Sequence, residues 1–370
     1  MTMRAAVLRD YKLSMPIECV AIEEPRADEV LVRMVATGIC HTDIKVATVQ
    51  GLSPRPIVLG HEGAGIVERV GANVRKVQPG DHVVLTFDSC GRCPTCLEGK
   101  PAYCYEVRDV CFGGKRLDGS TTISCDHGLI HGNFFGQSSF ASHALANERN
   151  AIKVRKDAPL ELLGPLGCGL QTGAGAVLNS LNLRPGQTIA VFGTGAVGLA
   201  AVMAARIAGA SKIFAVDISV ERLELARELG ATHIINSQSE YPLAKILAET
   251  GRGVDYSLDT TAVDAVAVQA IDCVGPLGTC GLIANKSPQQ SVPVNILSAM
   301  MKGRSVRGIV QGDSVPDLFI PRLVDFFMKG MFPFDKLVKF YDFEAINQAL
   351  DDAEHGRTIK PILRISSVSA

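Results

Sequence analysis

The stretch Ile189-Ala-Val-Phe-Gly193-Thr-Gly195-Ala-Val-Gly198 decides the fold. A short apolar run typical of a buried strand leads into the glycine spacing G-x-G-x-x-G, and a helix-forming run follows. Strand, glycine turn and helix in this order open a βαβ unit. Gly193 permits the tight turn, Gly195 lets the backbone approach a phosphate group, and Gly198 allows the helix to pack closely on the strand. A phosphate would lie at the positive end of this helix.

The alternation of strands and helices continues beyond this motif. Further strands are predicted at residues 212–216, 233–235, 254–258 and 279–283, with helical spacers between them. One of the helices is bounded by Ser219, a good N-cap, and by Gly230, a typical helix stop. Strands separated by helices of this length predict an α/β fold with a doubly wound parallel sheet and right-handed crossovers.

Asp217 stands at the end of the second predicted strand of this sheet, 19 residues after Gly198. Its carboxylate can accept hydrogen bonds from an adenosine ribose and would repel a 2′-phosphate, which favours NAD over NADP. The glycine spacing alone is weak evidence for a dinucleotide site, because a purely structural βαβ turn followed by a surface aspartate has the same residues. The flanking strand and helix, together with Asp217, favour a dinucleotide site.

A β-rich lobe is predicted before this region, up to about Phe87. Short strands and glycine turns are expected at residues 4–8, 30–34, 57–70 and 83–85. A helix near Pro321–Lys329 and a strand near Pro361–Ile365 have no place in the parallel sheet. We therefore expect the chain to return to the first lobe at its carboxyl end.

The composition is that of an ordinary globular chain, and its length of 370 residues predicts about two to three domains. It has 37 Lys and Arg against 38 Asp and Glu, with the signs interspersed, which argues against nucleic acid or a membrane surface as partner. Charged residues interrupt the amino terminus before an apolar signal segment forms, so a cytoplasmic protein is expected. The uncharged runs 162–183 and 185–205 contain proline or several glycines, and no transmembrane helix is predicted.

The cysteines point to metal rather than to a secreted disulfide scaffold. Four of them have the spacing C-x2-C-x2-C-x7-C, namely Cys90, Cys93, Cys96 and Cys104. Four thiolates from one loop complete a tetrahedral Zn²⁺ and leave no open position, so a structural zinc is predicted over an iron–sulfur cluster or unmetallated surface thiols. Five others have no ligand spacing and are interpreted as buried or incidental thiols: Cys19, Cys111, Cys125, Cys273 and Cys280.

A second set of metal-ligand residue types is scattered along the chain. Cys40, His61 and Cys168 each lie among glycines near the end of an apolar segment. Taken singly, such a residue is more often packed in a core. Together, two thiolates and one imidazole would leave a fourth position on a zinc free for water or an alcohol oxygen. Spacing alone does not show that these residues meet.

These phrases resemble a known family when taken together. Gly38-Ile-Cys40-His-Thr42-Asp43, Gly60-His61-Glu62-Gly63, the four-cysteine loop, Gly167-Cys168-Gly169 and the glycine motif stand in the order found in zinc-containing medium-chain alcohol dehydrogenases. The resemblance covers essentially the whole chain. Residues 162–176 and 333–341 are similar to the bacterial aryl-alcohol (benzyl alcohol) dehydrogenases.

The resemblance implies a GroES-like catalytic domain at residues 1–169 and 311–370, holding two zinc ions, and a Rossmann NAD-binding domain at residues 170–310, with the active site in the cleft between them. Cys40, His61 and Cys168 would bind the catalytic zinc. Asp43 would orient His61, and Glu62 would lie behind the metal and tune its coordination. Ordinary ion pairs are the alternative for these two carboxylates.

The family's proton and cofactor positions can also be assigned by resemblance. Thr42 would carry the alcohol proton away from the metal. Lys45 stands where relatives often have a histidine, which leaves the final proton acceptor open between this lysine and water. The remaining positions are cofactor contacts: His41 and Lys360 at the pyrophosphate, Arg222 at the adenosine ribose, and Thr172 and Val197 near the nicotinamide. Solvated surface cations and plain helix core are the alternatives for these residues.

The predicted reaction is reversible oxidation of an aromatic primary alcohol to its aldehyde, with hydride transfer to NAD. Phe87 is the first candidate to line a flat apolar substrate slot, with Phe134 and Phe135 as weaker candidates. Alternatives are an allylic terpenoid alcohol such as geraniol, S-hydroxymethylglutathione, or a non-catalytic protein that binds NAD or zinc. A strand near Ser305–Val310 is expected to pair across a twofold axis in a homodimer or homotetramer.

Overall fold

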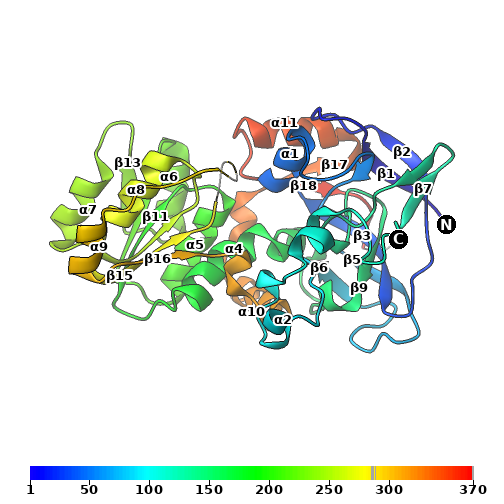
Figure 1. Ribbon diagram of the computed structural model, residues 1–370, viewed down its shortest axis with the longest axis horizontal. Coiled ribbons are helices and arrows are strands. Elements are labelled where there is room, and N and C mark those ends of the chain that lie inside the picture. Colours follow the sequence, from blue (N-terminus) through cyan, green and yellow to red (C-terminus); the bar gives the residue numbers. More distant parts are fainter. Residues whose placement is uncertain (285–286, 288, 369–370) are drawn as a thin grey trace. The chain divides into compact units, whose positions relative to one another are not determined.

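The computed structural model describes residues 1–284, 287 and 289–368, and it divides into two compact units (Figure 1). The first unit comprises Met1–Gly169, Val315–Met328 and Phe334–Ala370, and the second comprises Leu170–Ser314 and Lys329–Pro333. The return to the first unit comes at Val315 rather than at residue 311, because the turn Gln311–Asp313 packs within the second unit, with Gly312 against Gly175. Among the described residues, no helix is long and apolar enough to cross a membrane.

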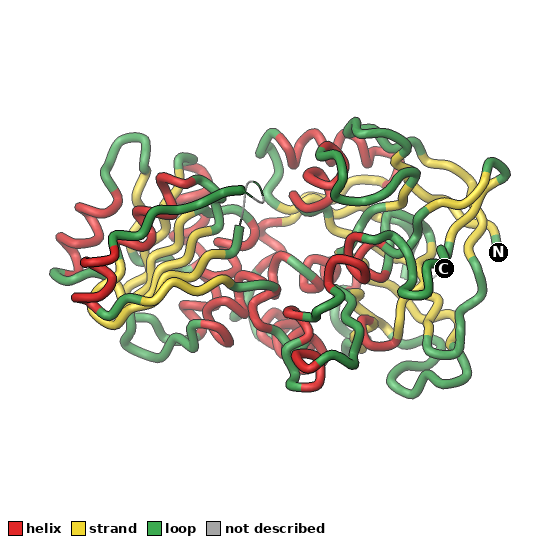
Figure 2. Tube along the Cα trace, viewed as in Figure 1, coloured by secondary structure: helices red, strands yellow, loops and turns green. Residues whose placement is uncertain are grey.

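The second unit is built on a six-stranded parallel sheet, drawn in yellow beside red helices in Figure 2. Its strands, in spatial order, are β13 (His233–Asn236), β12 (Lys212–Asp217), β11 (Thr188–Phe192), β14 (Val254–Asp259), β15 (Val274–Leu282) and β16 (Ser305–Gly308). Its helices are α5 (Ala196–Ile207), α6 (Val220–Leu229), α7 (Pro242–Thr250), α8 (Asp264–Asp272) and α9 (Ile296–Lys302). The strand order reverses between β11 and β14, and ligands of doubly wound sheets bind at the carboxyl ends of the strands beside such a reversal.

Local signals set the boundaries of these elements as the sequence predicted. The Ser219 hydroxyl accepts a hydrogen bond from the backbone N–H of Arg222 at 3.3 Å and caps α6. The helix ends at Gly230, whose φ of +130° is a conformation that glycine adopts without steric cost. Phe192 and Phe214, which lie on the neighbouring strands β11 and β12, are buried in the core of this unit.

The first unit contains two sheets. A five-stranded sheet has the order β4 (Ile57–Val58), β1 (Thr2–Leu8), β2 (Ile17–Ile22), β7 (Ile123–Cys125) and β8 (Gly128–Ile130). A seven-stranded sheet has the order β10 (Ala151–Lys153), β6 (His82–Leu85), β5 (Glu62–Val70), β3 (Glu29–Gly38), β18 (Lys360–Arg364) and β17 (Val338–Asp342), with β9 (His143–Asn147) also paired to β3. The β-rich lobe is therefore confirmed, and β18 joins it antiparallel to β3.

The helices of this unit are α1 (His41–Thr48), α2 (Pro94–Leu97), α3 (Leu160–Leu163), α10 (Pro316–Met328) and α11 (Ile346–Glu354), while α4 (Gly169–Gly175) begins at its boundary. Ion pairs fasten α10 to the rest of the unit, from Lys76 to Asp317 at 2.5 Å and from Arg155 to Asp325 at 3.0 Å. The helix predicted near Pro321–Lys329 is α10, and the strand predicted near Pro361–Ile365 is β18. Both belong to the first unit, as the sequence predicted.

Candidate active site

The glycine motif has the geometry that a dinucleotide requires. Gly193 has a φ of +90°, so it makes the turn that a residue with a Cβ resists. A Cβ on Gly198 would collide with the carbonyl oxygen of Gly193, which explains the close packing of helix on strand. Gly195 is the N-cap of α5, and none of the residues that the structure describes lies within 4 Å of where its Cβ would be. This open space at a helix N-terminus fits a pyrophosphate.

Asp217 ends β12, and backbone donors hold its carboxylate. Oδ2 accepts from the N–H and hydroxyl of Thr194, at 2.6 and 2.7 Å, and Oδ1 accepts from the N–H groups of Ile218 and Ser219 at 2.7 and 3.0 Å. Burial alone would raise the pKa of Asp217, but these hydrogen bonds lower it below its usual range. The carboxylate is therefore ionised and fixed in orientation.

Residues far apart in the sequence converge in the first unit. Four of them each offer one ligand atom, all within 4.8 Å of one another: Cys40, His61, Glu62 and Cys168. Cys40 precedes α1 at the end of β3, His61 and Glu62 lie at the start of β5, and Cys168 follows the turn Gly164–Gly167. A hydrogen bond from Cys168 and the nearby imidazole of His61 lower the pKa of Cys40 well below its usual value, against the effect of burial.

Asp43 holds the imidazole of His61 from behind. Its Oδ1 lies 2.9 Å from Nδ1 of His61 and accepts the N–H of Gly60 at 3.1 Å, while Oδ2 accepts the N–H of Cys40 at 3.0 Å. Nδ1 of His61 is thus engaged, whereas Nε2 is fully buried and has no hydrogen-bond partner among the described residues. A buried nitrogen without a partner costs free energy unless a ligand occupies it. An orphaned imidazole nitrogen beside two thiols fits a zinc ion.

Glu62 forms an ion pair, which was the alternative given for it, but the pair is buried and its partner Lys360 was not predicted. Lys360 Nζ donates to both carboxylate oxygens, at 3.0 and 2.8 Å, and to the carbonyl oxygen of Ile39 at 3.0 Å. Burial raises the pKa of Glu62, with the ammonium opposing it. Burial would lower the pKa of Lys360, but the carboxylate outweighs burial and raises it. Lys360 thus lies against Glu62, and its contact with a pyrophosphate stays a prediction.

The four-cysteine loop brings its thiols together, and the structure gathers Cys90, Cys93, Cys96 and Cys104 with their sulfurs within 4.8 Å of one another. Backbone N–H groups point at these sulfurs: that of Cys93 lies 3.3 Å from the sulfur of Cys90, and those of Cys90 and Glu106 lie 3.2 and 3.4 Å from the sulfur of Cys104. Such donors stabilise thiolates around a metal. The donor set fits a closed, structural Zn²⁺ site.

The other predicted residues lie on several elements. On α1, Thr42 and Lys45 are half-buried and His41 is exposed. Within the second unit, Val197 and Arg222 are half-buried, and the hydroxyl of Thr172 lies 3.4 Å from Oε1 of Gln311, a residue that the sequence analysis missed. Their cofactor roles stay predictions.

The predicted substrate phenylalanines all lie in the first unit. Phe87 is 5% exposed and belongs to its apolar core. The rings of Phe134 and Phe135 both contact the imidazole of His61. Gln137, which the sequence analysis missed, donates from Nε2 to the carbonyl oxygen of His61 at 3.0 Å. No spacing rule identifies Gln137, because its hydrogen-bond partners lie more than fifty residues away in the sequence.

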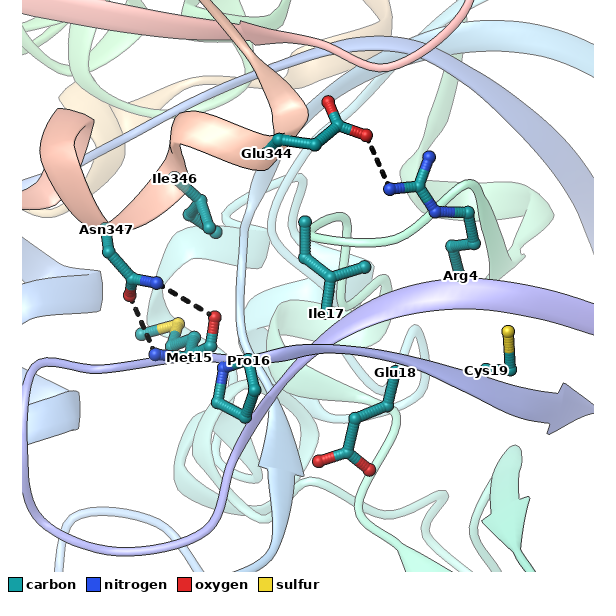
Figure 3. Close-up of a pocket in the computed structure, with 9 residues that line it drawn as sticks. All are labelled: Arg4, Met15, Pro16, Ile17, Glu18, Cys19, Glu344, Ile346 and Asn347. Atoms are coloured by element: carbon teal, nitrogen blue, oxygen red, sulfur yellow. Dashed lines mark hydrogen bonds and ion pairs between the residues drawn. The ribbon is translucent and has the colours of Figure 1, made fainter.

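A hollow of about 290 Å³ lies apart from these residues, between β2 and the start of α11 (Figure 3). Arg4 pairs with Glu344 at 2.5 Å there, and Asn347 bonds both backbone groups of Met15. Among the described residues, no predicted site residue lines it. Cys19, on its wall, is exposed rather than buried, because it lies on the solvent face of β2.

Comparisons with known proteins agree with this geometry. Residues 26–156 match the alcohol dehydrogenase GroES-like domain, and residues 196–328 match the zinc-binding dehydrogenase family. A geraniol dehydrogenase from Castellaniella defragrans is 47% identical over 97% of both chains. The chain belongs to the zinc-containing medium-chain alcohol dehydrogenases.

Solved structures of this dehydrogenase family include close relatives of the chain. A zinc-binding alcohol dehydrogenase domain protein from Burkholderia ambifaria has a TM-score of 0.98 at 54% identity and covers 99% of both chains. Benzyl alcohol dehydrogenase from Acinetobacter calcoaceticus has a TM-score of 0.96 at 44% identity, covering 99% of this chain and all of that one. The GroES-like and Rossmann-type domains that the resemblance implied are thereby confirmed, and the chain is a zinc-dependent oxidoreductase of this family.

Proposed function

We propose that the enzyme reversibly oxidises an aromatic primary alcohol of the benzyl type to its aldehyde, with hydride transfer to NAD. The observation that carries this proposal is the buried Nε2 of His61, which has no hydrogen-bond partner among the described residues and lies in one cluster with the thiols of Cys40 and Cys168. The similarity to benzyl alcohol dehydrogenase supports the aromatic substrate. The similarity to geraniol dehydrogenase favours a second candidate, an allylic terpenoid alcohol.

Each residue of the cluster has a distinct part in this proposal. Cys40, His61 and Cys168 would hold one zinc, and the four-cysteine loop would hold a second. Zinc supplies Lewis-acid chemistry that lowers the pKa of an alcohol hydroxyl. Asp43 keeps Nδ1 of His61 engaged, so that Nε2 faces the ligand position. The Thr42 hydroxyl receives the alcohol proton, and Lys45 or water accepts it next.

NAD is proposed over NADP because of Asp217. Its carboxylate is ionised, and the hydrogen bonds of Thr194 and Ser219 fix its position at the end of β12. An ionised carboxylate at this strand end accepts hydrogen bonds from ribose hydroxyls and repels a 2′-phosphate. The kinetic experiment below therefore uses both cofactors, and NAD is expected to give the higher kcat/KM.

Steady-state kinetics over benzyl, cinnamyl, terpenoid and short aliphatic alcohols tests the proposal. We expect the highest kcat/KM with benzyl alcohol, and we expect Phe87→Ala to lower that value roughly 10-fold more than the value for a short alkanol, because an apolar contact contributes about 1–3 kcal/mol to discrimination. Both alcohols are assayed on one preparation, so a loss of folded enzyme cancels in the ratio. Equal losses would remove Phe87 from the substrate slot, and a higher kcat/KM for geraniol would favour the second candidate.

We also propose that the chain assembles through the edge of its parallel sheet. β16 is one of the two edge strands of the described sheet, with Val306 exposed, and neighbouring α9 exposes Met300 and Met301 at 68% and 74%. A strand at the edge of a sheet beside an apolar surface is typical of a contact between copies. Sedimentation velocity is expected to show dimers or tetramers, and Val306→Lys is expected to shift them toward monomers. A native chain that sediments only as a monomer would contradict this.

A further inference from the structure

The loop Phe134–Phe140 is buried throughout, yet two of its residues with a side chain have left-handed backbone. φ is +51° at both Phe135 and Ser138, with Gly136 at +65° between them. A Cβ is disfavoured in this region, so each of the two residues costs conformational free energy. Such conformations persist only where the surrounding structure holds them, and they are frequent at functional sites.

Hydrogen bonds tie this loop to residues 58–63, the segment that carries His61. Gln137 donates from Nε2 to the carbonyl oxygen of His61 at 3.0 Å and accepts at Oε1 from the N–H of Gly63 at 3.1 Å. The hydroxyl of Ser138 donates to the carbonyl oxygen of Val58 at 2.6 Å. These bonds fix the loop against the backbone of His61 and offset the cost of its left-handed residues.

The left-handed turn lets two adjacent phenylalanines face one imidazole. In a strand, neighbouring side chains point to opposite faces, so Phe134 and Phe135 would not both contact His61. Here Phe135 stacks on His61, with centroids 4.5 Å apart and planes at 27°. Phe134 meets the same ring by its edge, at 5.6 Å and 84°. Phe112 supports the ring of Phe135, with centroids 5.1 Å apart.

We propose that Phe135 is a positioning residue that sets the plane of the His61 imidazole and thereby the direction of Nε2 toward the metal position. Asp43 holds the ring at Nδ1 only, and one hydrogen bond leaves the ring free to tilt about that contact. The stacked ring of Phe135 removes this freedom. The proposal rests on the proposed function, since it assigns a task at the same metal site.

The test compares Phe135→Leu with Phe134→Leu in the zinc-loaded enzyme. Both variants remove a ring that contacts His61 from the same loop, and only the first removes the stacked one. We expect Phe135→Leu to lower the affinity for one zinc about 10- to 100-fold, as is typical when a group that orients a ligand is lost, so a chelator should remove this zinc faster. The second zinc, in the four-cysteine loop, is the internal reference and should leave at the wild-type rate. Phe134→Leu should change the first rate much less.

A cobalt-substituted enzyme gives a second readout, because visible d–d bands of Co²⁺ report ligand geometry. Phe135→Leu should alter these bands. Phe135→Tyr keeps an aromatic ring at this position and should show the wild-type bands. Phe135→Gly relieves the left-handed backbone while it removes the ring, so it keeps the test valid if the leucine variant folds poorly. It should fold and still show the altered bands.

Each other outcome overturns the inference. If Phe135→Leu raises only KM and leaves the zinc release rate and the Co²⁺ bands unchanged, Phe135 lines the substrate pocket and does not position His61. Equal changes in the two leucine variants would show general packing rather than positioning. Failure of the proposed function looks different, since the wild-type chain itself would then bind one zinc or oxidise no alcohol.

Discussion

Replacement of Cys168 by alanine is expected to reduce the zinc content from two ions to one per chain and to lower kcat/KM roughly 10³-fold, since a Lewis acid supplies several kcal/mol of transition-state stabilisation. Cys168 lies in the cluster with Cys40 and His61, and the four-cysteine loop does not include it. Two remaining ligands hold a zinc ion poorly, because tetrahedral catalytic sites use three protein ligands. Metal analysis of the purified variant and NAD-coupled kinetics measure the two effects.

Cys111→Ala is the matched control for this experiment. Cys111 is also a buried thiol of the first unit, at 1% exposure, and it belongs to neither cysteine cluster. Its replacement should leave both zinc ions and most of the activity. A Cys168→Ala enzyme that keeps two zinc ions and wild-type turnover would contradict the assignment of this cluster as the catalytic site.

Lys360→Met is expected to lower the free energy of unfolding by about 3–5 kcal/mol, the usual effect of removing one partner from a buried ion pair. Glu62 is fully buried and the side chain of Lys360 is 4% exposed, so the carboxylate would be left without its cation or access to water. At roughly 2–4 °C per kcal/mol for a unit of this size, the thermal midpoint should fall by about 10 °C. Calorimetry of the zinc-loaded protein measures it.

The double variant Glu62→Gln with Lys360→Met separates the ion pair from simple loss of packing. It removes both charges, so it should recover much of the lost stability. Lys12→Met is the exposed control, because Lys12 pairs with Asp10 at 3.8 Å with 81% of its side chain exposed. It should change the stability by about 0.5 kcal/mol or less. A Lys360→Met midpoint equal to that of this control would show that the buried charge is relieved in another way.

Features that depend on neighbouring residues were predictable from the sequence. β11 (Thr188–Phe192) contains the apolar run that was predicted as a strand before the glycine motif, and α6 starts after its Ser219 cap and ends at Gly230. The four-cysteine loop was equally visible, because its ligands lie within fifteen residues of one another. In each case the physical cause is local: backbone sterics, a capping hydrogen bond, or a short loop that closes around an ion.

The glycine motif, Asp217 and the four-cysteine loop could be recognised from short runs of the sequence. Contacts between distant side chains, in contrast, depend on the tertiary fold. Spacing did not bring Cys40 and Cys168 together; the resemblance implied it, and the packing of β3 and β5 with the turn before Cys168 accomplishes it. Lys360 on Glu62 and Phe135 on His61 were not foreseen. These contacts depend on strand register and on a left-handed loop, which are set by the summed packing of the whole unit rather than by any short run of residues.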